Sequence, residues 1–335
     1  MREYELIEKI IKDFPRSPQQ YNKFLTCDAE IINIGKQALA LTIDEFSPTE
    51  DFFTDDDPEK LGHNLVVATI SDLYAAGSTP LFFMQSLTIL QKIEDFFLDK
   101  LTRGIRNTLA EANCFLCGGD LSFSETWRYT GFALGNFPNQ STNTPKFLQR
   151  IIPVEPQILW ITGTLGDANL AVITKNSTPY FELRDKEAIL IKKYATSCID
   201  TSGGLMDALF CLHQVSPRIA IELNLEKIPF TAQAKEQTHS LSFPKEALLV
   251  GGAGEYELLF TTPDTLSTVE KQELIAAGIT LIGYTHPDKE SKVITNKGFQ
   301  KKQIAELPPC PRDIGSFAEY TKQVLDFTQK FLVYE

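Results

Sequence analysis

Short apolar blocks alternate with helical patterns along the whole chain and predict a mixed α/β protein. In the first half, residues 81–87 and 127–134 have the composition of strands, and residues 93–112 between them have the spacing of an amphipathic helix. The second half begins with a strand pattern at residues 157–163 and continues with a charged helical pattern at residues 182–196. We therefore predict two α/β halves with mixed sheets.

Two apolar runs near the N-terminus each end in a carboxylate. Residues 24–28 lead to Asp28, and residues 37–44 lead to Asp44. We interpret them as two strands of one hairpin, which would bring the two carboxylates near one another. Solvated strand ends are the alternative interpretation of either residue alone.

The segment from residue 58 to residue 77 has small or apolar residues on nearly every side, and it predicts a buried helix that ends at Gly77. Asp72 lies in the last turns of this helix, where the helix dipole and burial both disfavour a carboxylate. Such a residue needs a cation or hydrogen-bond donors. We favour the interpretation that Asp72 is a metal ligand. The alternative is a structural aspartate whose carboxylate is satisfied by hydrogen-bond donors.

A glycine-rich turn follows the apolar run at residues 114–117, in the triplet Gly118-Gly119-Asp120. We interpret this stretch as a buried strand that presents the Asp120 carboxylate to a hard cation at its tip, with an ordinary turn as the alternative.

Two further glycine-rich turns lie in the second half. Asp200 ends a short apolar run, and Ser202-Gly203-Gly204 opens the next helix with free N–H groups that suit a phosphate. Residues 251–254 form the other turn, which precedes a strand. Neither turn has the spacing of a P-loop or of a dinucleotide-binding fingerprint.

The composition is that of an ordinary globular protein. The 335 residues are 43% hydrophobic and 23% charged, and the net charge of -12 argues against a nucleic-acid partner. Apolar runs stay well short of the roughly 20 residues of a membrane helix, and the N-terminus predicts an amphipathic helix, so we expect no membrane partner and no signal peptide. The six cysteines, including Cys114 and Cys117 at Cys-x-x-Cys spacing, are interpreted as free thiols in a reducing cytoplasm.

Residues 136–146 are the most linker-like segment of the chain, because serine, threonine, asparagine and proline dominate it. We place a domain boundary there. The predicted domains are residues 1–140 and residues 150–312, followed by a C-terminal helix within residues 313–335.

Four ordered motifs carry a resemblance that covers most of the chain. They are ISDLYAAGSTP (70–80), CGGDLS (117–122), ITGTLGDANLA (161–171) and GEYELLFTT (254–262). In this order they resemble the thiamine-monophosphate kinase family and, more distantly, the aminoimidazole ribonucleotide synthetase superfamily to which that family belongs.

The resemblance implies a two-domain fold of that superfamily and an ATP-dependent reaction. The N-terminal half would pair across a two-fold axis into an intersubunit β-barrel, so we expect a homodimer, and the C-terminal half would form an α/β sandwich with ATP in the cleft between the halves. The implied chemistry is transfer of the ATP γ-phosphoryl group to a small phosphorylated acceptor, assisted by Mg²⁺. Such a reaction depends mainly on charge neutralisation and alignment.

Carried over motif by motif, the resemblance implies three sets of site residues, and we assign no side chain to catalysis itself. The metal set is Asp28, Thr42, Asp44, Asp72, Asp120 and Asp200. The nucleotide set is Gly119, Asp120, Arg150 and Ser202, and the substrate set is Asp51 and Gly254.

This chain departs from the family pattern at three of these positions. Gly203 stands where the family has a second aspartate, so one expected metal ligand is missing. Asp51 replaces a substrate-contacting histidine, and Gly254 replaces a substrate-contacting glutamate. A carboxylate at position 51 would repel an acceptor phosphate.

Three hypotheses follow. The first is an ATP- and Mg²⁺-dependent phosphotransferase of the thiamine-monophosphate kinase type. The second is another ATP-using reaction of the superfamily, such as ring closure or amide dehydration through a phosphoryl intermediate. The third is a nucleotide-binding homodimer that has lost catalysis, which the changes at Asp51, Gly203 and Gly254 favour.

Overall fold

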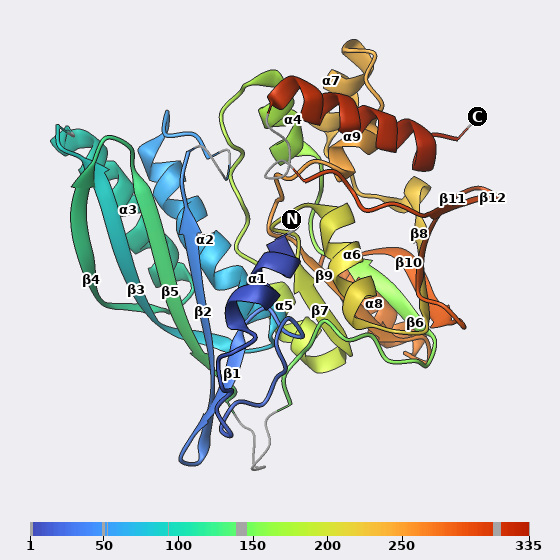
Figure 1. Ribbon diagram of the computed structural model, residues 1–335, viewed down its shortest axis with the longest axis horizontal. Helices are drawn as coiled ribbons and strands as arrows, with labels where there is room; N and C mark the ends of the chain where they lie inside the picture. Colours follow the sequence, from blue (N-terminus) through green and yellow to red (C-terminus); the bar gives the residue numbers. More distant parts are fainter. Residues whose placement is uncertain are drawn as a thin grey trace.

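Two sheets organise the chain in the computed structural model, which describes residues 3–48, 51, 53–92, 94–138, 146–310 and 316–334. The first half forms a five-stranded sheet and the second half a seven-stranded sheet, and the two stand side by side (Figure 1). The predicted mixed α/β architecture is therefore confirmed. We propose the two halves as the two domains of the protein.

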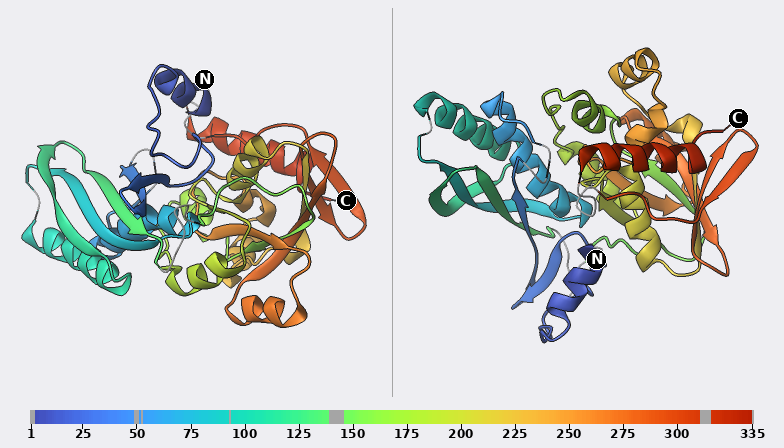
Figure 2. Two further views of the ribbon diagram at one scale, coloured as in Figure 1. Left: turned by 90° about the horizontal axis from the view of Figure 1, so that it is seen from below. Right: turned by 45° about the horizontal axis from the view of Figure 1, so that its top comes forward.

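The N-terminal sheet has the strand order β1-β2-β5-β3-β4. Neighbouring strands are antiparallel except for β3 and β4, which are parallel. The strands are β1 (Glu30–Ile34), β2 (Gln37–Phe46), β3 (Thr79–Leu90), β4 (Phe115–Ser124) and β5 (Arg128–Asn136). Helix α2 (Pro58–Ala75) packs against β2, β3 and β5, and α3 (Asp95–Glu111) packs against α2. The short helix α1 (Glu3–Ile11) stands outside both sheets (Figure 2).

Two glycines allow α2 and α3 to touch backbone to backbone. A Cβ atom added at Gly62 of α2 would lie 2.2 Å from the carbonyl oxygen of Leu101, and one added at Gly104 of α3 would lie 2.0 Å from the carbonyl oxygen of Glu59. Neither position can hold a side chain without separating the helices. The pair therefore fixes α2, the helix that carries Asp72, against its support.

The C-terminal sheet has the strand order β12-β11-β8-β10-β6-β9-β7. Its strands are β6 (Gln157–Ile161), β7 (Ser197–Asp200), β8 (Ile219–Asn224), β9 (Leu258–Pro263), β10 (Thr280–Pro287), β11 (Lys292–Lys297) and β12 (Gln300–Ile304). Its helices are α4 (Asp167–Thr174), α5 (Asp185–Tyr194), α6 (Leu205–Val215), α7 (Ala232–Ser240), α8 (Thr268–Ala276) and α9 (Phe317–Phe331), with short 3-10 turns at Leu225–Lys227 and Lys245–Leu249.

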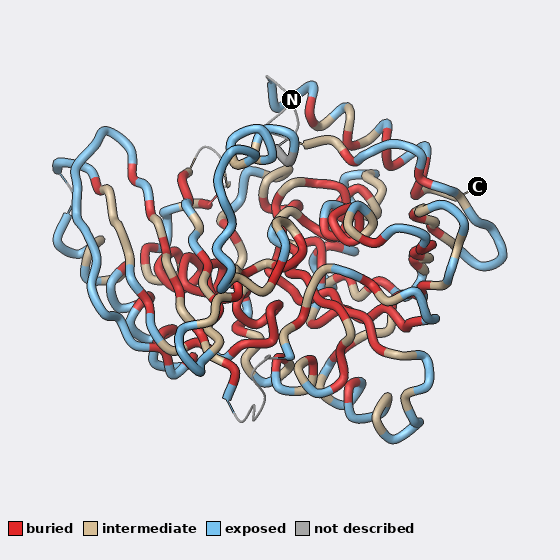
Figure 3. The backbone as a smooth tube through the Cα atoms, turned by 60° about the horizontal axis from the view of Figure 1, so that its bottom comes forward, coloured by how far each residue is buried: buried red, intermediate tan, exposed pale blue. Residues whose placement is uncertain are grey.

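The apolar cores join the two halves. One core packs α6 and α9 on the C-terminal sheet. The other core contains the interior of the N-terminal half and continues under α5 and α8, where it includes Trp160, Ile191 and Phe260. The buried stretches of the chain gather in the centre of the molecule, in both halves (Figure 3).

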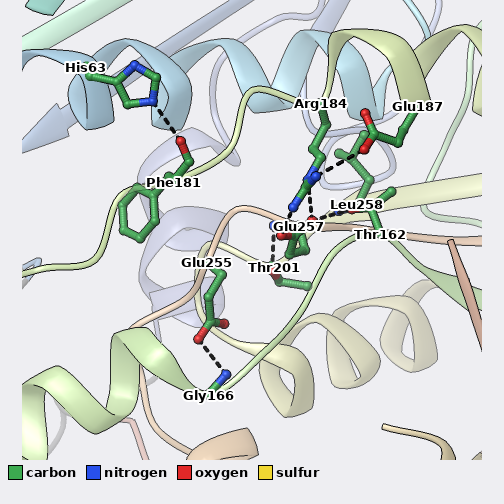
Figure 4. A network of polar contacts seen from close by, with 10 residues as sticks. All are labelled: His63, Thr162, Gly166, Phe181, Arg184, Glu187, Thr201, Glu255, Glu257 and Leu258. Atoms are coloured by element: carbon green, nitrogen blue, oxygen red, sulfur yellow. Dashed lines mark hydrogen bonds and ion pairs between the residues drawn. The ribbon is translucent and has the colours of Figure 1, made fainter. Parts of the chain in front are cut away.

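An extended segment, residues 176–184, fastens the second half to the start of α2. The side-chain amide of Asn64 donates to the carbonyl of Pro179 at 2.8 Å and accepts from the N–H of Phe181 at 3.0 Å. His63 Nε2 lies 2.7 Å from the carbonyl oxygen of Phe181 (Figure 4), and its ring stacks on Tyr180. These contacts hold the two halves in one orientation.

The predicted strand at residues 24–28 is wrong. This stretch turns, with Leu25 at a φ of 61°, and the first strand begins only at Glu30. The carbonyl of Thr26 accepts from the N–H of Arg150 at 2.8 Å, so the backbone here bonds to the segment that enters the second half. Asp28 consequently faces the junction of the two halves and is not the end of a hairpin strand.

The prediction of a buried strand around Gly118-Gly119-Asp120 is also wrong in its burial. β4 is the edge strand of the sheet, it is exposed along its whole length, and Asp120 lies within it and not at its tip. The tube in Figure 3 is pale blue along the margin where Figure 1 places β4. Among the described residues, no helix is long and apolar enough to cross a bilayer.

The helix contact gives a first prediction. Gly104→Ala should lower the free energy of unfolding by about 2 kcal/mol or more, because the new methyl group overlaps the carbonyl of Glu59. Urea denaturation measures the loss, and Thr102→Ala, at an exposed position of the same helix, should change stability by less than about 0.5 kcal/mol. Equal stability of the two variants would contradict the close contact.

Candidate functional site

A cleft with a volume of about 1170 Å³ opens between the two halves. Its lining from the N-terminal half includes residues of β2 and α2, and its lining from the C-terminal half includes the end of β7, the start of α6 and the glycine-rich residues 252–254. A cavity of this size accommodates a nucleotide together with a second small ligand.

Three carboxylates converge at the base of this cleft. One oxygen from each of Asp28, Asp72 and Asp200 lies within 4.8 Å of the others. They come from the turn before β1, from α2 and from the end of β7, so the cluster exists only because the two halves pack together.

Short hydrogen bonds fix each member of this acid cluster. Thr42 donates its hydroxyl proton to Asp72 Oδ2 at 2.5 Å, and Ser71 donates to Asp200 Oδ2. Arg150 donates from Nε to Asp28 Oδ1 at 2.9 Å and completes an ion pair with the same oxygen. The side chain of Asp28 is only 1% exposed, and its other oxygen is buried without a hydrogen-bond partner among the described residues.

Burial and mutual repulsion disfavour the charged form of these carboxyls. Burial raises the pKa of Asp28 to about 6, against the opposing effect of Arg150, and it raises the pKa values of Asp72 and Asp200. Asp44 lies close enough to be affected: burial, then the charges of Asp200 and Asp28, raise its pKa to about 7. A bound cation would relieve this repulsion.

The donor set fits a hard divalent cation. It consists of carboxylate and hydroxyl oxygens, including the orphaned oxygen of Asp28, and Mg²⁺ prefers such ligands and retains several waters. The residues that would hold it are Asp28, Asp72 and Asp200, with Asp44 beside them.

Most of the other predicted site residues lie along the same cleft. Thr42, Asp51, Arg150, Ser202 and Gly254 all line it. The Asp51 carboxylate accepts from the N–H of Ser47 at 2.8 Å, which fixes its orientation at the loop after β2.

Gly119 and Asp120 lie elsewhere. In the sheet, Asp44 is in register with Gly131, Gly131 with Gln85, and Gln85 with Gly119. Three strand spacings therefore separate Gly119 from Asp44, a distance of about 14 Å. Within one chain, Asp120 and the acid cluster cannot share a metal ion.

The structure also places a carboxylate that the sequence interpretation missed. A Cβ atom added at Gly203 would lie 2.5 Å from Oδ2 of Asp207, which lines the cleft from the first turn of α6. The space next to Gly203 thus already contains an acid, supplied from one helical turn later. In the sequence, the only sign of this contact was the four-residue spacing between Gly203 and Asp207, which brings side chains close together on a helix.

Gly254, in contrast to Gly203, lies against backbone atoms and not beside a carboxylate. A Cβ atom there would lie 1.6 Å from the carbonyl oxygen of Thr201 and 2.6 Å from that of Ser202. The backbone of this turn presses against the residues that follow β7, so this conformation admits no side chain at position 254.

Comparisons with known proteins identify relatives of this sequence and fold. The model of the family "AIR synthase related protein, N-terminal domain" matches residues 27–137. The chain is 28% identical to the thiamine-monophosphate kinase of Archaeoglobus fulgidus over 273 residues, which cover 78% of this chain and 86% of that protein. It is 27% identical to the thiamine-monophosphate kinase of Buchnera aphidicola from Acyrthosiphon pisum, with 89% and 98% covered.

Among solved structures, the fold matches one described as AaThiL complexed with AMPPCP and TMP. The TM-score is 0.74 at 23% identity, with 90% of this chain and 98% of that chain covered. The chain is thus similar to thiamine-monophosphate kinases over most of its length, and its N-terminal half matches the AIR synthase related family.

The chain has the fold that the resemblance of its four sequence motifs predicted. The family model spans five of the six residues in the predicted metal set, from Asp28 to Asp120. Pairing of two chains into a β-barrel stays a prediction.

The electrostatics of the acid cluster give a second prediction. In metal-free protein at pH 8, Asp72→Asn should raise the free energy of unfolding by roughly 1–2 kcal/mol, because it removes a buried charge whose pKa is raised. The pKa of Asp72 is higher in the folded protein than in the unfolded chain. Its carboxyl therefore stabilises the fold at a pH below the pKa of the unfolded state, where it is protonated. This contribution is lost as the pH rises through the pKa of the folded state. The advantage of the variant should therefore shrink as the pH falls.

Addition of Mg²⁺ should reverse the order of the two proteins. The ion should raise the Tm of the wild type and of Asp99→Asn, a variant at an exposed position of α3, and leave that of Asp72→Asn nearly unchanged. Differential scanning fluorimetry measures all three, and an equal shift for Asp72→Asn would contradict metal binding at the cluster.

Proposed function

We propose that this protein is an ATP- and Mg²⁺-dependent phosphotransferase of the thiamine-monophosphate kinase type. The observation that carries the proposal is the convergence of Asp28, Asp72 and Asp200 in a cleft large enough for two ligands. The similar structure whose description names AMPPCP and TMP supports it, because that protein was studied with a nucleotide analogue and a phosphorylated compound together.

In this proposal Mg²⁺ supplies the charge neutralisation that brings ATP and acceptor together. The acid cluster holds the ion, and Arg150 keeps Asp28 oriented while its guanidinium reaches the cleft. Ser202 and the N-terminus of α6 offer a hydroxyl and backbone N–H groups to a phosphate. Phe46, Phe53 and other aromatic residues close one wall of the cleft and limit access of water to the reacting groups.

The acceptor side determines which compounds can react. Asp51 lines the cleft and repels a phosphate placed beside it, so the acceptor phosphate must point away from Asp51 and toward the acid cluster with its cation. A cationic ring at the other end of the acceptor would interact favourably with Asp51. Thiamine monophosphate has this distribution of charge and is the first acceptor to test.

Turnover is the direct test. With Mg²⁺ and thiamine monophosphate, a coupled assay should detect ADP release by the wild type, and Asp200→Asn should reduce kcat by about 100-fold or more through loss of a charged cluster member. Asp99→Asn should retain full activity. A panel of phosphorylated and unphosphorylated acceptors identifies the best substrate.

Calorimetry with a non-hydrolysable ATP analogue and Mg²⁺ separates the outcomes. Tight binding by a wild type that turns over none of the acceptors would favour the catalytically inactive nucleotide binder. Absence of both binding and turnover would reject the proposal altogether.

We propose, further, that the active form is a homodimer in which β4 of one chain faces its partner. β4 exposes Phe115, Leu116, Leu121 and Phe123 on an unpaired sheet edge, an arrangement that proteins normally cover. The distance of about 14 Å between Gly119 and Asp44 is consistent with Asp120 acting on the partner's cleft.

Subunit mixing tests this arrangement. Asp120→Asn and Asp72→Asn should each be inactive alone, and a random mixture should recover about a quarter of wild-type activity, because half of the dimers contain one intact site of two. Activity assays after mixing through mild denaturation, with size-exclusion chromatography, measure the recovery. No recovery from two inactive variants would mean that Asp120 acts within its own chain, and full activity of Asp120→Asn alone would mean that Asp120 has no role in the site.

A further inference from the structure

The segment Gly254–Leu258 is clamped from both sides. Glu255 points to one side and accepts from the N–H groups of Gly166 at 2.8 Å and Ala168 at 3.1 Å, at the start of α4 (Figure 4). Glu257 points to the other side (Figure 4) and pairs with the guanidinium of Arg184. Both glutamates are buried.

Further bonds hold the backbone of the same segment. Glu257 accepts from the hydroxyl of Thr162 at 2.5 Å, and its own N–H donates to the hydroxyl of Thr201 at 2.9 Å. The N–H of Leu258 donates to the hydroxyl of Thr162 at 2.8 Å. Gly254, at the start of the segment, packs tightly against the carbonyl of Thr201. The residue between the two glutamates therefore has no freedom to move away.

That residue is Tyr256, and its backbone is strained. Its φ of 57° lies in the left-handed region, which is a rare conformation for a bulky aromatic residue. Such strain persists only where the surroundings enforce it, most often at functional sites. A simple core position would not require it.

The strained backbone directs the Tyr256 side chain into the candidate site. Its ring packs on Phe181 with centroids 5.0 Å apart and on Phe53 at 6.3 Å, and the residue lines the cleft. Asp51 and the acid cluster line the same cleft. The Tyr256 side chain therefore shares this cleft with the proposed acceptor side and with the acid cluster.

The phenol is a hydrogen-bond donor in this position. Burial, followed by the surrounding carboxylates, keeps its pKa well above the usual range, so the group stays protonated and cannot act as a base. Within the described residues the hydroxyl makes no hydrogen bond, and a phenylalanine would fill the same apolar space equally well. A donor without a partner in the protein suits an anionic ligand.

We propose that Tyr256 contacts the acceptor and donates its hydroxyl proton in a hydrogen bond to an oxygen of the acceptor phosphate. This inference rests on the proposed phosphotransferase function and extends it by a residue that orients the acceptor between Asp51 and the acid cluster. The flanking glutamates set the direction of this donor through the backbone.

Tyr256→Phe isolates the hydroxyl, because it keeps the ring packing. With thiamine monophosphate, Mg²⁺ and saturating ATP, the variant should show a KM for the acceptor raised about tenfold or more. Its Tm and its affinity for a non-hydrolysable ATP analogue should match those of the wild type. Tyr74→Phe removes another buried hydroxyl, one without a partner among the described residues and outside the lining of the cleft, and it should behave like the wild type in every assay.

The binding arm of the experiment separates this inference from the proposed function. Calorimetry of thiamine monophosphate with Mg²⁺ and the ATP analogue should show binding that Tyr256→Phe weakens and Tyr74→Phe leaves unchanged. If the wild type binds the acceptor without turnover, the proposed function fails while weaker binding by Tyr256→Phe still supports the contact. Equal acceptor affinity of wild type and Tyr256→Phe, or no acceptor binding by the wild type, would overturn the role of Tyr256.

Discussion

The repulsion among buried carboxylates is the constraint on which the rest of this structure depends. Asp28, Asp72 and Asp200 approach within 4.8 Å of one another, and burial raises the pKa of each. A cluster of this kind opposes the association of the two halves unless a cation is present. The continuous apolar core and the attachment of residues 176–184 to α2 supply the opposing attraction. These contacts hold together a cluster of carboxylates that repel one another, and a bound cation would relieve that repulsion.

The C-terminal side of the cleft explains how this chain differs from the family pattern. The missing acid at Gly203 has a neighbour in Asp207, whose carboxylate occupies the adjacent space from one turn further along α6. Gly254 is different, because the carbonyl of Thr201 excludes any side chain there. The first departure leaves negative charge in the same region, whereas the second removes a side chain and brings two backbone turns together.

That close approach of backbones has consequences along the next residues. Gly254 packs on the turn after β7, Glu255 bonds to the start of α4, and Glu257 bonds to Arg184. Between these fixed residues, Tyr256 has a left-handed backbone conformation. The segment thus lacks a side chain at Gly254 and holds the Tyr256 ring in the lining of the cleft two residues later. Asp28, Asp72 and Asp200 line the same cleft.

The sequence by itself predicted the mixed α/β fold, the similarity to thiamine-monophosphate kinases and the carboxylates of the acid cluster, because periodicity and local motifs encode them. Asp72 was recognisable from its unfavourable place at the end of a buried helix, and Asp200 from the glycine-rich turn that follows it. Tertiary structure decided what depends on distant partners. Residues 24–28 turn because their backbone bonds to Arg150, β4 is an exposed edge because no further strand covers it among the described residues, and Asp120 is separated from Asp44 by three strands. Asp207 escaped the sequence interpretation because only packing reveals which side chain fills the space beside Gly203. Tyr256 escaped it because only the folded backbone shows a left-handed residue whose side chain lines the cleft.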